Sequence, residues 1–140
     1  MMMLQLFAHA ETSPEHPWRS LRDRSYAASP AEIARLLRDA VASMPRWRYI
    51  GYDRGAGVIH LEHDTPLIAF TDDVILHLRA DGERTSVTAR SRSRVGSFDF
   101  GVNMMNLRSI LRALDRAVAT SRLAGEPAAG DRRTAGSMIP

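Results

Sequence analysis

The chain has 140 residues, of which 44% are hydrophobic and 25% are charged, values typical of one compact globular domain. It contains no cysteine, which excludes disulfides, thiol nucleophiles and metal sites built on cysteine. The formal net charge of +3 is small, and the basic residues, all of them arginine, form no dense cluster of the kind that dedicated nucleic-acid-binding proteins carry.

The two ends of the chain differ in composition from its middle. Residues 8–28 are polar, contain prolines and show no periodicity, and residues 122–140 are rich in Gly, Ala and Pro. We therefore predict a flexible N-terminal segment over residues 1–28, a single folded domain over 29–121 and a disordered tail over 122–140. No apolar run approaches the roughly 20 residues that span a bilayer, so we expect no transmembrane segment.

The first ten residues end in Ala8-His9-Ala10, which resembles a signal-peptidase site. The apolar stretch before it is short and lacks a basic leader, so we interpret it as a flexible terminus. On this interpretation the protein is cytoplasmic. If the stretch is instead a truncated export signal, the protein belongs to the cell envelope.

A first helix is predicted to start at Ser29. Ser29 is a good N-cap residue, Pro30 suits the first helical position, and Glu32 suits the positive end of the helix dipole. Apolar residues then recur at spacings of three and four up to Met44, and Pro45 prevents continuation. The helix therefore covers something on one side only.

Four strands are predicted next, because four segments are rich in β-branched and aromatic residues. They cover about residues 47–53, 57–64, 67–80 and 85–95. Asp81-Gly82 is a strong hairpin signal, and a four-stranded antiparallel meander is the simplest topology. Asp72-Asp73 interrupts the apolar run of the third strand, which indicates a bulge or bend there.

A last helix is predicted from apolar residues at helical spacing. They are Met104, Leu107, Ile110, Leu111, Leu114 and Val118. Two one-sided helices that flank a meander predict an α+β two-layer domain, with an N-terminal helix, a four-stranded antiparallel sheet and a C-terminal helix, both helices on one face. In the fourth strand small residues alternate with arginines, which places Arg90 and Arg94 on the other face.

Several motifs carry a resemblance to a known family. They are Asp72-Asp73-Val74, Arg90-Ser91, Ser93-Arg94-Val95-Gly96, Asp99 and Gly101-Val102-Asn103. Through them, and over most of residues 29–118, the sequence resembles the bacterial and plant family called domain of unknown function 1499. The resemblance implies a small domain with no established activity, often found beside membrane segments or export signals. Family members frequently carry a basic residue where this chain has Asn106.

The junction between the fourth strand and the last helix is the best candidate for a site, because polar residues and glycines are dense there. The start of a helix presents free N–H groups and the positive end of its dipole, which favour anions. We hypothesise a weak site for an anionic group, formed by Arg90, Arg94, Asn103 and Arg108.

The same junction also has a purely structural interpretation. Asp99 and Asn103 straddle the predicted helix start, where such residues cap free N–H groups. Gly96 breaks the strand, and Gly101 permits tight backbone geometry.

Asp72 and Asp73 are adjacent, so in an extended strand their side chains point to opposite faces and form no carboxylate dyad. A role in a turn or bulge is the preferred interpretation. The alternative is that one of them forms a bidentate ion pair with Arg90 or Arg94 on the neighbouring strand.

Three histidines, His60, His63 and His77, lie on neighbouring predicted strands. The three-residue spacing of the first two places them on opposite faces, so we predict no metal site. Trp47 and Tyr49 alternate with arginines, a pattern compatible with base stacking but more typical of core packing.

No nucleophile elbow, phosphate loop or dinucleotide fingerprint is present, so we predict neither a catalytic residue nor a cofactor. We favour a non-enzymatic binding or accessory module that recognises an anionic small molecule or a lipid headgroup. One alternative is an enzyme that uses Asp72 or Asp73 as a base and arginines as anion clamps on the polar sheet face. Another is a protein–protein interaction module.

Overall fold

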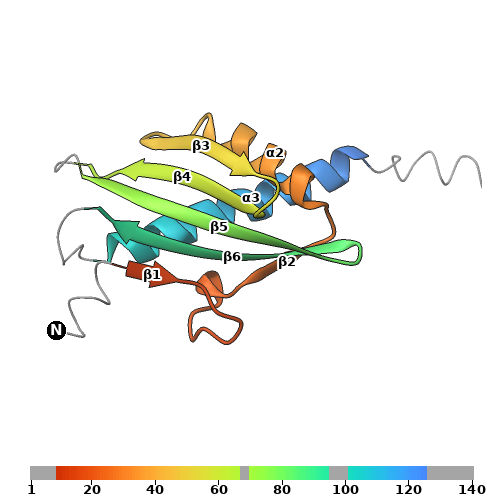
Figure 1. Cartoon of the computed structure of the whole chain (residues 1–140), viewed down its shortest axis with the longest axis horizontal. Coiled ribbons are helices and arrows are strands. Elements are labelled where there is room, and N and C mark those ends of the chain that lie inside the picture. The colour runs from red at the N-terminus through yellow and green to blue at the C-terminus, as the bar shows by residue number, and fades with distance from the viewer. Residues whose placement is uncertain (1–8, 67–69, 95–100, 126–140) are drawn as a thin grey trace, which may run out of the picture.

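The computed structural model describes residues 9–66, 70–94 and 101–125, which form an α+β domain (Figure 1). A meander of four strands comprises β3 (Trp47–Asp53), β4 (Val58–Asp64), β5 (Thr71–Asp81) and β6 (Arg84–Ser93). It lies between α2 (Pro30–Val41) and α3 (Val102–Gly125) in the chain. Ahead of α2 come β1 (His9–Glu11), the 3-10 helix η1 (Arg19–Leu21) and β2 (Arg24–Tyr26). The predicted helix, meander and helix are confirmed, and two short strands join them.

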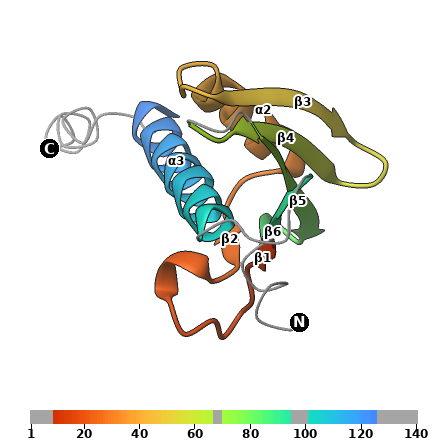
Figure 2. The ribbon, with the colours of Figure 1, turned by 90° about the vertical axis from the view of Figure 1, so that its left-hand side faces the viewer.

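All six strands form one antiparallel sheet with the order β1-β6-β5-β4-β3, and β2 also pairs with β6. The hairpin between β5 and β6 closes at the pair Asp81 and Arg84, with Gly82 at φ +62°. Both helices lie on the same side of the sheet, and α3 runs along its face (Figure 2). We call the helix-covered side the inner face and the opposite side the outer face.

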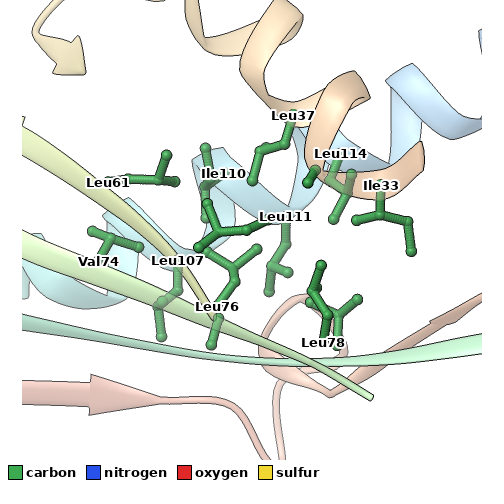
Figure 3. Packing of buried hydrophobic residues seen from close by; sticks show 14 of the residues in the cluster. Ile33, Leu37, Leu61, Val74, Leu76, Leu78, Leu107, Ile110, Leu111 and Leu114 are labelled. Carbon is green, nitrogen blue, oxygen red and sulfur yellow. The ribbon is translucent and has the colours of Figure 1, made fainter. Parts of the chain in front are cut away.

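The hydrophobic core lies between the inner face and the two helices, because residues along a strand alternate between faces. Buried and more exposed residues alternate along β5 from Asp72 to Leu78. The inward apolar side chains meet one face of each helix (Figure 3). Fully buried members include Ile33, Leu37, Leu61, Val74, Leu76, Leu107, Ile110, Leu111 and Leu114. Each such side chain contributes ~1.5–3 kcal/mol relative to exposure, so this contact fixes α3 on the sheet.

The β5 strand is continuous through Asp72 and Asp73, so the predicted bulge at this dipeptide is wrong. Asp72 pairs with His63 on β4, and the register continues without a shift through Asp73. The register shift of the sheet falls in β3 instead, between Tyr49 and Gly51. No bulge is needed at the two aspartates because each carboxylate finds polar partners on its own face.

The segment before α2 is packed over residues 9–28, contrary to the prediction of a flexible N-terminus. Its strands cover the second edge of β6, which would otherwise expose unpaired backbone groups. Leu21 and Tyr26 are only 1% and 9% exposed. Tyr26 donates a hydrogen bond to Asp115 on α3, and Arg24 pairs with the same carboxylate. These contacts are with distant parts of the chain, which is why the segment shows no local periodicity.

The helix boundaries follow local signals at their starts. The Ser29 side chain accepts a hydrogen bond from the Glu32 N–H, which confirms the predicted cap. Helix α3 begins directly after Gly101, at φ +82°, and runs to Gly125, past the predicted domain end at residue 121. Residues 126–140 lie outside the described part, so the disordered tail stays a prediction. Within the described ranges, no helix is both long and apolar enough to span a membrane.

Candidate functional site

The polar residues near the end of strand β6 point alternately to the two faces of the sheet. Ser91 is fully buried on the inner face, whereas Arg90, Arg92 and Arg94 are exposed on the outer face. This is the alternation that the sequence predicts. The consequence is two separate polar regions, one on each side of the same strand.

On the outer face, Asp73 and Arg94 form a bidentate ion pair. The Arg94 Nε and Nη2 atoms donate to the two Asp73 oxygens at 2.9 and 2.8 Å. Arg94 also donates to Glu62, and His60 Nε2 lies 2.8 Å from Asp73 Oδ1. The hydrogen bonds from Arg94 lower the pKa of Asp73. Of the two interpretations of this aspartate, the structure shows the ion pair.

Arg48 extends the ion pairs across the outer face to β3. It donates to Glu62 at 3.2 Å and to Asp64 at 3.0 Å. The side-chain atoms of His60, Glu62 and Asp73 that could bind a metal lie within 4.8 Å of one another, a spacing compatible with a metal ion. Both carboxylates already accept hydrogen bonds from arginines, so we assign these side chains to the ion-pair network.

A hollow of about 670 Å³ lies beside this network on the outer face. Its lining residues are His9, Asp73, Ile75, Arg90, Arg92, Ser93 and Arg94. Arg94 is engaged by Asp73, but no described residue forms an ion pair with Arg90 or Arg92. The hollow therefore contains two guanidinium groups that form no ion pair with a described residue, although Glu11 and Asp73 lie opposite Arg90 and Arg92 on the neighbouring strands.

On the inner face, polar side chains interrupt the hydrophobic core near the start of α3. We call this group the inner polar cluster; its members are His63, Asp72, Ser91, Asn103 and Asn106. The last four are at most 3% exposed. Ser91 Oγ donates to Asn103 Oδ1 at 2.6 Å, and Asn106 Nδ2 donates to Asp72 Oδ2 at 2.8 Å. Asn106 Nδ2 also lies 3.3 Å from Ser91 Oγ, so strands and helix share one hydrogen-bonded unit.

Two buried atoms of this cluster, Asp72 Oδ1 and His63 Nδ1, have no hydrogen-bond partner in the described part of the chain. His63 Nδ1 lies 3.6 Å from Asp72 Oδ2, beyond hydrogen-bond distance. The Trp47 ring packs against the His63 ring with centroids 4.8 Å apart. Trp47 and Tyr49 both pack on the core, as the sequence predicts.

The motifs shared with a known family extend over both polar regions. A family model described as protein of unknown function (DUF1499) matches residues 6–114. The chain belongs to the DUF1499 family. This confirms the resemblance seen in the sequence. No curated protein matches the DUF1499 chain significantly.

Solved structures resemble the DUF1499 domain in fold at low sequence identity. The di-domain ARO/CYC BexL from the BE-7585A biosynthetic pathway superposes with a TM-score of 0.50 and 16% identity, covering 79% of this chain and 46% of that one. The chain thus spans about half of BexL. TTHA0849 from Thermus thermophilus gives 0.42 and 11%, covering 81% and 98%. The Zhui aromatase/cyclase from Streptomyces sp. R1128 gives 0.41 and 14%, covering 85% and 98%.

The DUF1499 structure does not bring the four predicted anion-binding residues together. Arg90 and Arg94 line the outer hollow, whereas Asn103 lies on the inner face, where it donates to Ser93 Oγ at 3.0 Å. Arg108 lies on the exposed side of α3, beside Arg112. These residues are close together in the sequence, but the strand and the helix place their side chains on different sides of the domain. Gly96 and Asp99 fall outside the described residues, and their roles stay predictions.

The sequence interpretation of this DUF1499 protein missed His63, Ser91 and Asn106 as members of a polar cluster. Each is a polar residue at an inward position of a strand or helix, and that placement is the signal that could have found them. The cluster becomes visible only when β4 and β5 are aligned, because His63 and Asp72 are direct partners in that register.

Proposed function

We propose that this DUF1499 protein is a binding module whose outer hollow recognises a small molecule with an anionic group, such as a phosphate. The observation that carries the proposal is the pair Arg90 and Arg92, which share a strand face, line the hollow and form no ion pair with a described residue. Side chains two positions apart on a strand lie about 7 Å apart, a separation that lets two guanidinium groups bind one phosphate.

Arg94 has a different role in this proposal. Its bonds to Asp73 and Glu62 hold it at the wall of the hollow, so we assign it to shaping the site. The fold resemblance to an ARO/CYC protein of a biosynthetic pathway adds an analogy in favour of a small molecule as the class of ligand.

The test is a titration of the ¹⁵N-labelled protein with inorganic phosphate, followed by NMR. We expect shifts at β6 amides and at the Arg90 and Arg92 Nε signals, and their loss in the double variant Arg90→Gln/Arg92→Gln. Arg79→Gln is the matched control, because Arg79 is an exposed arginine of β5 that does not line the hollow. Unmoved signals, or equal shifts in the double variant, would reject this site.

A lipid headgroup carries the same phosphate chemistry as a free anion. Vesicles of phosphatidylcholine with and without phosphatidylglycerol distinguish the two sources. Binding to the anionic vesicles only, lost in the same double variant, identifies a headgroup. A response to phosphate without vesicle binding identifies a free ligand.

An enzyme with an aspartate base on the outer face is the weaker candidate. The pKa of Asp73 is lowered by its hydrogen bonds from Arg94, which makes this carboxylate a poor acceptor of protons at neutral pH. Asp72, the other candidate base, points away from this face into the core. The outer face is therefore better suited to binding than to proton transfer.

A further inference from the structure

The inner polar cluster occupies a place where this fold would otherwise have apolar packing. Asp72 is fully buried between β5 and α3, and Leu107 and Ile110 of the same helix are equally buried. A buried polar atom without a partner costs about 1–3 kcal/mol, and a carboxylate costs more. The chain retains such a carboxylate with one oxygen unpaired. A buried polar group left unsatisfied in a native structure calls for a specific explanation, and a catalytic role is one such explanation.

The hydrogen bonds of the cluster hold Asp72 in one orientation. Asn106 donates to Oδ2 at 2.8 Å, and Ser91, itself bonded to Asn103, lies behind Asn106. These partners come from β6 and α3, so the carboxylate is fixed from two elements. Asp72 Oδ2 is also the oxygen that faces His63.

His63 lies at the boundary between this cluster and solvent. Its side chain is 13% exposed, while its Nδ1 atom is buried on the Asp72 side at 3.6 Å from Oδ2. Trp47 packs against the ring. No described residue forms a hydrogen bond with the Nε2 atom. Unlike Nδ1, Nε2 is not fully buried. The ring thus presents one nitrogen to a buried carboxylate and leaves the other accessible.

We propose that His63 is an acid–base group for a small molecule bound beside Trp47, with Asp72 as its positioning residue. Because Nδ1 faces the Asp72 carboxylate, the carboxylate favours the Nδ1–H tautomer, and the Nε2 lone pair then accepts a proton from an O–H, N–H or acidic C–H group of the bound molecule. The bonding electron pair stays on that molecule, the imidazolium is stabilised by Asp72, and the reverse transfer restores both partners. The proposal requires the Nδ1 to Oδ2 distance of 3.6 Å to shorten to a hydrogen bond when the site is occupied, as is common for catalytic hydrogen bonds.

The His63 site and the arginines of the outer hollow lie on opposite faces of the sheet, and a hydrogen bond from Asn103 to Ser93 links the inner polar cluster to the lining of the hollow. Phosphate binding at Arg90 and Arg92 can fail without consequence for His63. The ionisable groups near His63 are Asp72 on β5 and Asp64, which follows His63 in the chain. From α3, the residue that contacts Asp72 is Asn106, which carries no charge.

The first test is acylation of the folded protein with limiting diethyl pyrocarbonate, which attacks unprotonated and accessible imidazole nitrogen. Modification at His63 and at the exposed His77 is quantified by peptide mass spectrometry. We expect His63 to react at least as fast as His77, despite its far smaller exposure. If His63 is protected while His77 reacts, the histidine is structural and the proposal fails.

The second test addresses Asp72. In Asp72→Asn, with an unchanged circular dichroism spectrum, we expect acylation of His63 to slow by about tenfold, the lower end of the losses in metal affinity or activity that follow when a ligand histidine loses its carboxylate partner. His77→Gln is the control, since it removes a histidine of the same sheet without touching the cluster. Equal rates at His63 with and without the carboxylate would overturn the role of Asp72.

A third measurement needs no variant and decides the case if Asp72→Asn does not fold. The ¹⁵N shifts of the His63 ring nitrogens in the wild-type protein report the tautomer above the titration range. The proposal requires protonated Nδ1 and unprotonated Nε2. The opposite tautomer would overturn it, because Nε2 could then accept no proton.

Discussion

Adjacent residues of identical type have opposite roles in this domain. Asp72 and Asp73 differ by one position on β5, so one points into the core and the other into solvent. Asp73 is paired with Arg94, whereas the side-chain partners of Asp72 among the described residues are the amide of Asn106 and the nearby ring of His63. The charge of Asp73 is balanced by a surface ion pair, whereas Asp72 is a fully buried carboxyl group with one unpaired oxygen.

At the same scale, the pKa of Asp64 tests the ion-pair network. Hydrogen bonds from Arg48 lower this pKa to about 2 from its ordinary value of 3.8. Because the folded-state pKa is depressed, the pair stabilises the fold above about pH 4, and this contribution is lost as the pH falls toward 2. We expect Arg48→Gln to raise the pKa of Asp64 but not to restore it fully, since Thr71 still donates.

The measurement is a ¹³C NMR titration of the side-chain carboxyl groups. Arg54→Gln is the control, because Arg54 is exposed in the turn after β3 and has no recorded ion pair with a described residue. A pKa of Asp64 that stays near 2 in Arg48→Gln would show that another group stabilises the carboxylate.

At the scale of elements, β6 connects most of the domain. It pairs with β5 along one edge and with β1 and β2 along the other, and its inner side contacts α3. The segment before α2 is therefore a structural part of the sheet. Its apolar anchor is Leu21, and its polar anchor is the contact of Arg24 and Tyr26 with Asp115.

We expect Leu21→Ala to destabilise the domain by about 2–5 kcal/mol, the usual cost of truncating a fully buried leucine. Leu21 is 1% exposed, whereas Trp18, three residues earlier, is 52% exposed. Trp18→Ala is thus the matched control and should change the free energy of unfolding by about 0.5 kcal/mol or less. Urea denaturation measures both. Similar small effects would mean that the segment is not anchored in solution.

At the scale of the whole molecule, helices cover one face of the sheet and leave the other open (Figure 2). The open face carries the ion-pair network and the hollow, while the covered face carries the core and the inner polar cluster. The two proposed sites therefore do not compete for space. They can be tested in one protein with separate variants.

The strand order predicts a gradient of local stability. Strand β5 is bonded on both sides, whereas β3 pairs only with β4 among the described strands. In native-state hydrogen exchange we expect β5 amides to exchange only on global unfolding, and alternate β3 amides, which face outward, to exchange early. Equal protection of these outward amides would indicate that another chain covers the β3 edge.

Local patterns in the sequence were enough to predict the architecture and part of the site. Periodicity, the cap at Ser29 and the Asp81-Gly82 turn are local, so they predicted the helices, the meander and the two faces of β6. The same alternation correctly placed Arg90 and Arg94 outside. Each of these predictions depends only on neighbours within a few positions along the chain.

Only the tertiary structure decided which residues that are distant in the sequence contact one another. Folding packs residues 9–28 against β6 and α3, separates Asn103 and Arg108 from the arginines of β6, and brings His63 beside Asp72. These outcomes depend on strand register and on which side of a helix faces the sheet, and a shift by one residue would reverse every side chain. No local pattern encodes that choice, because it is made by the burial of the whole core.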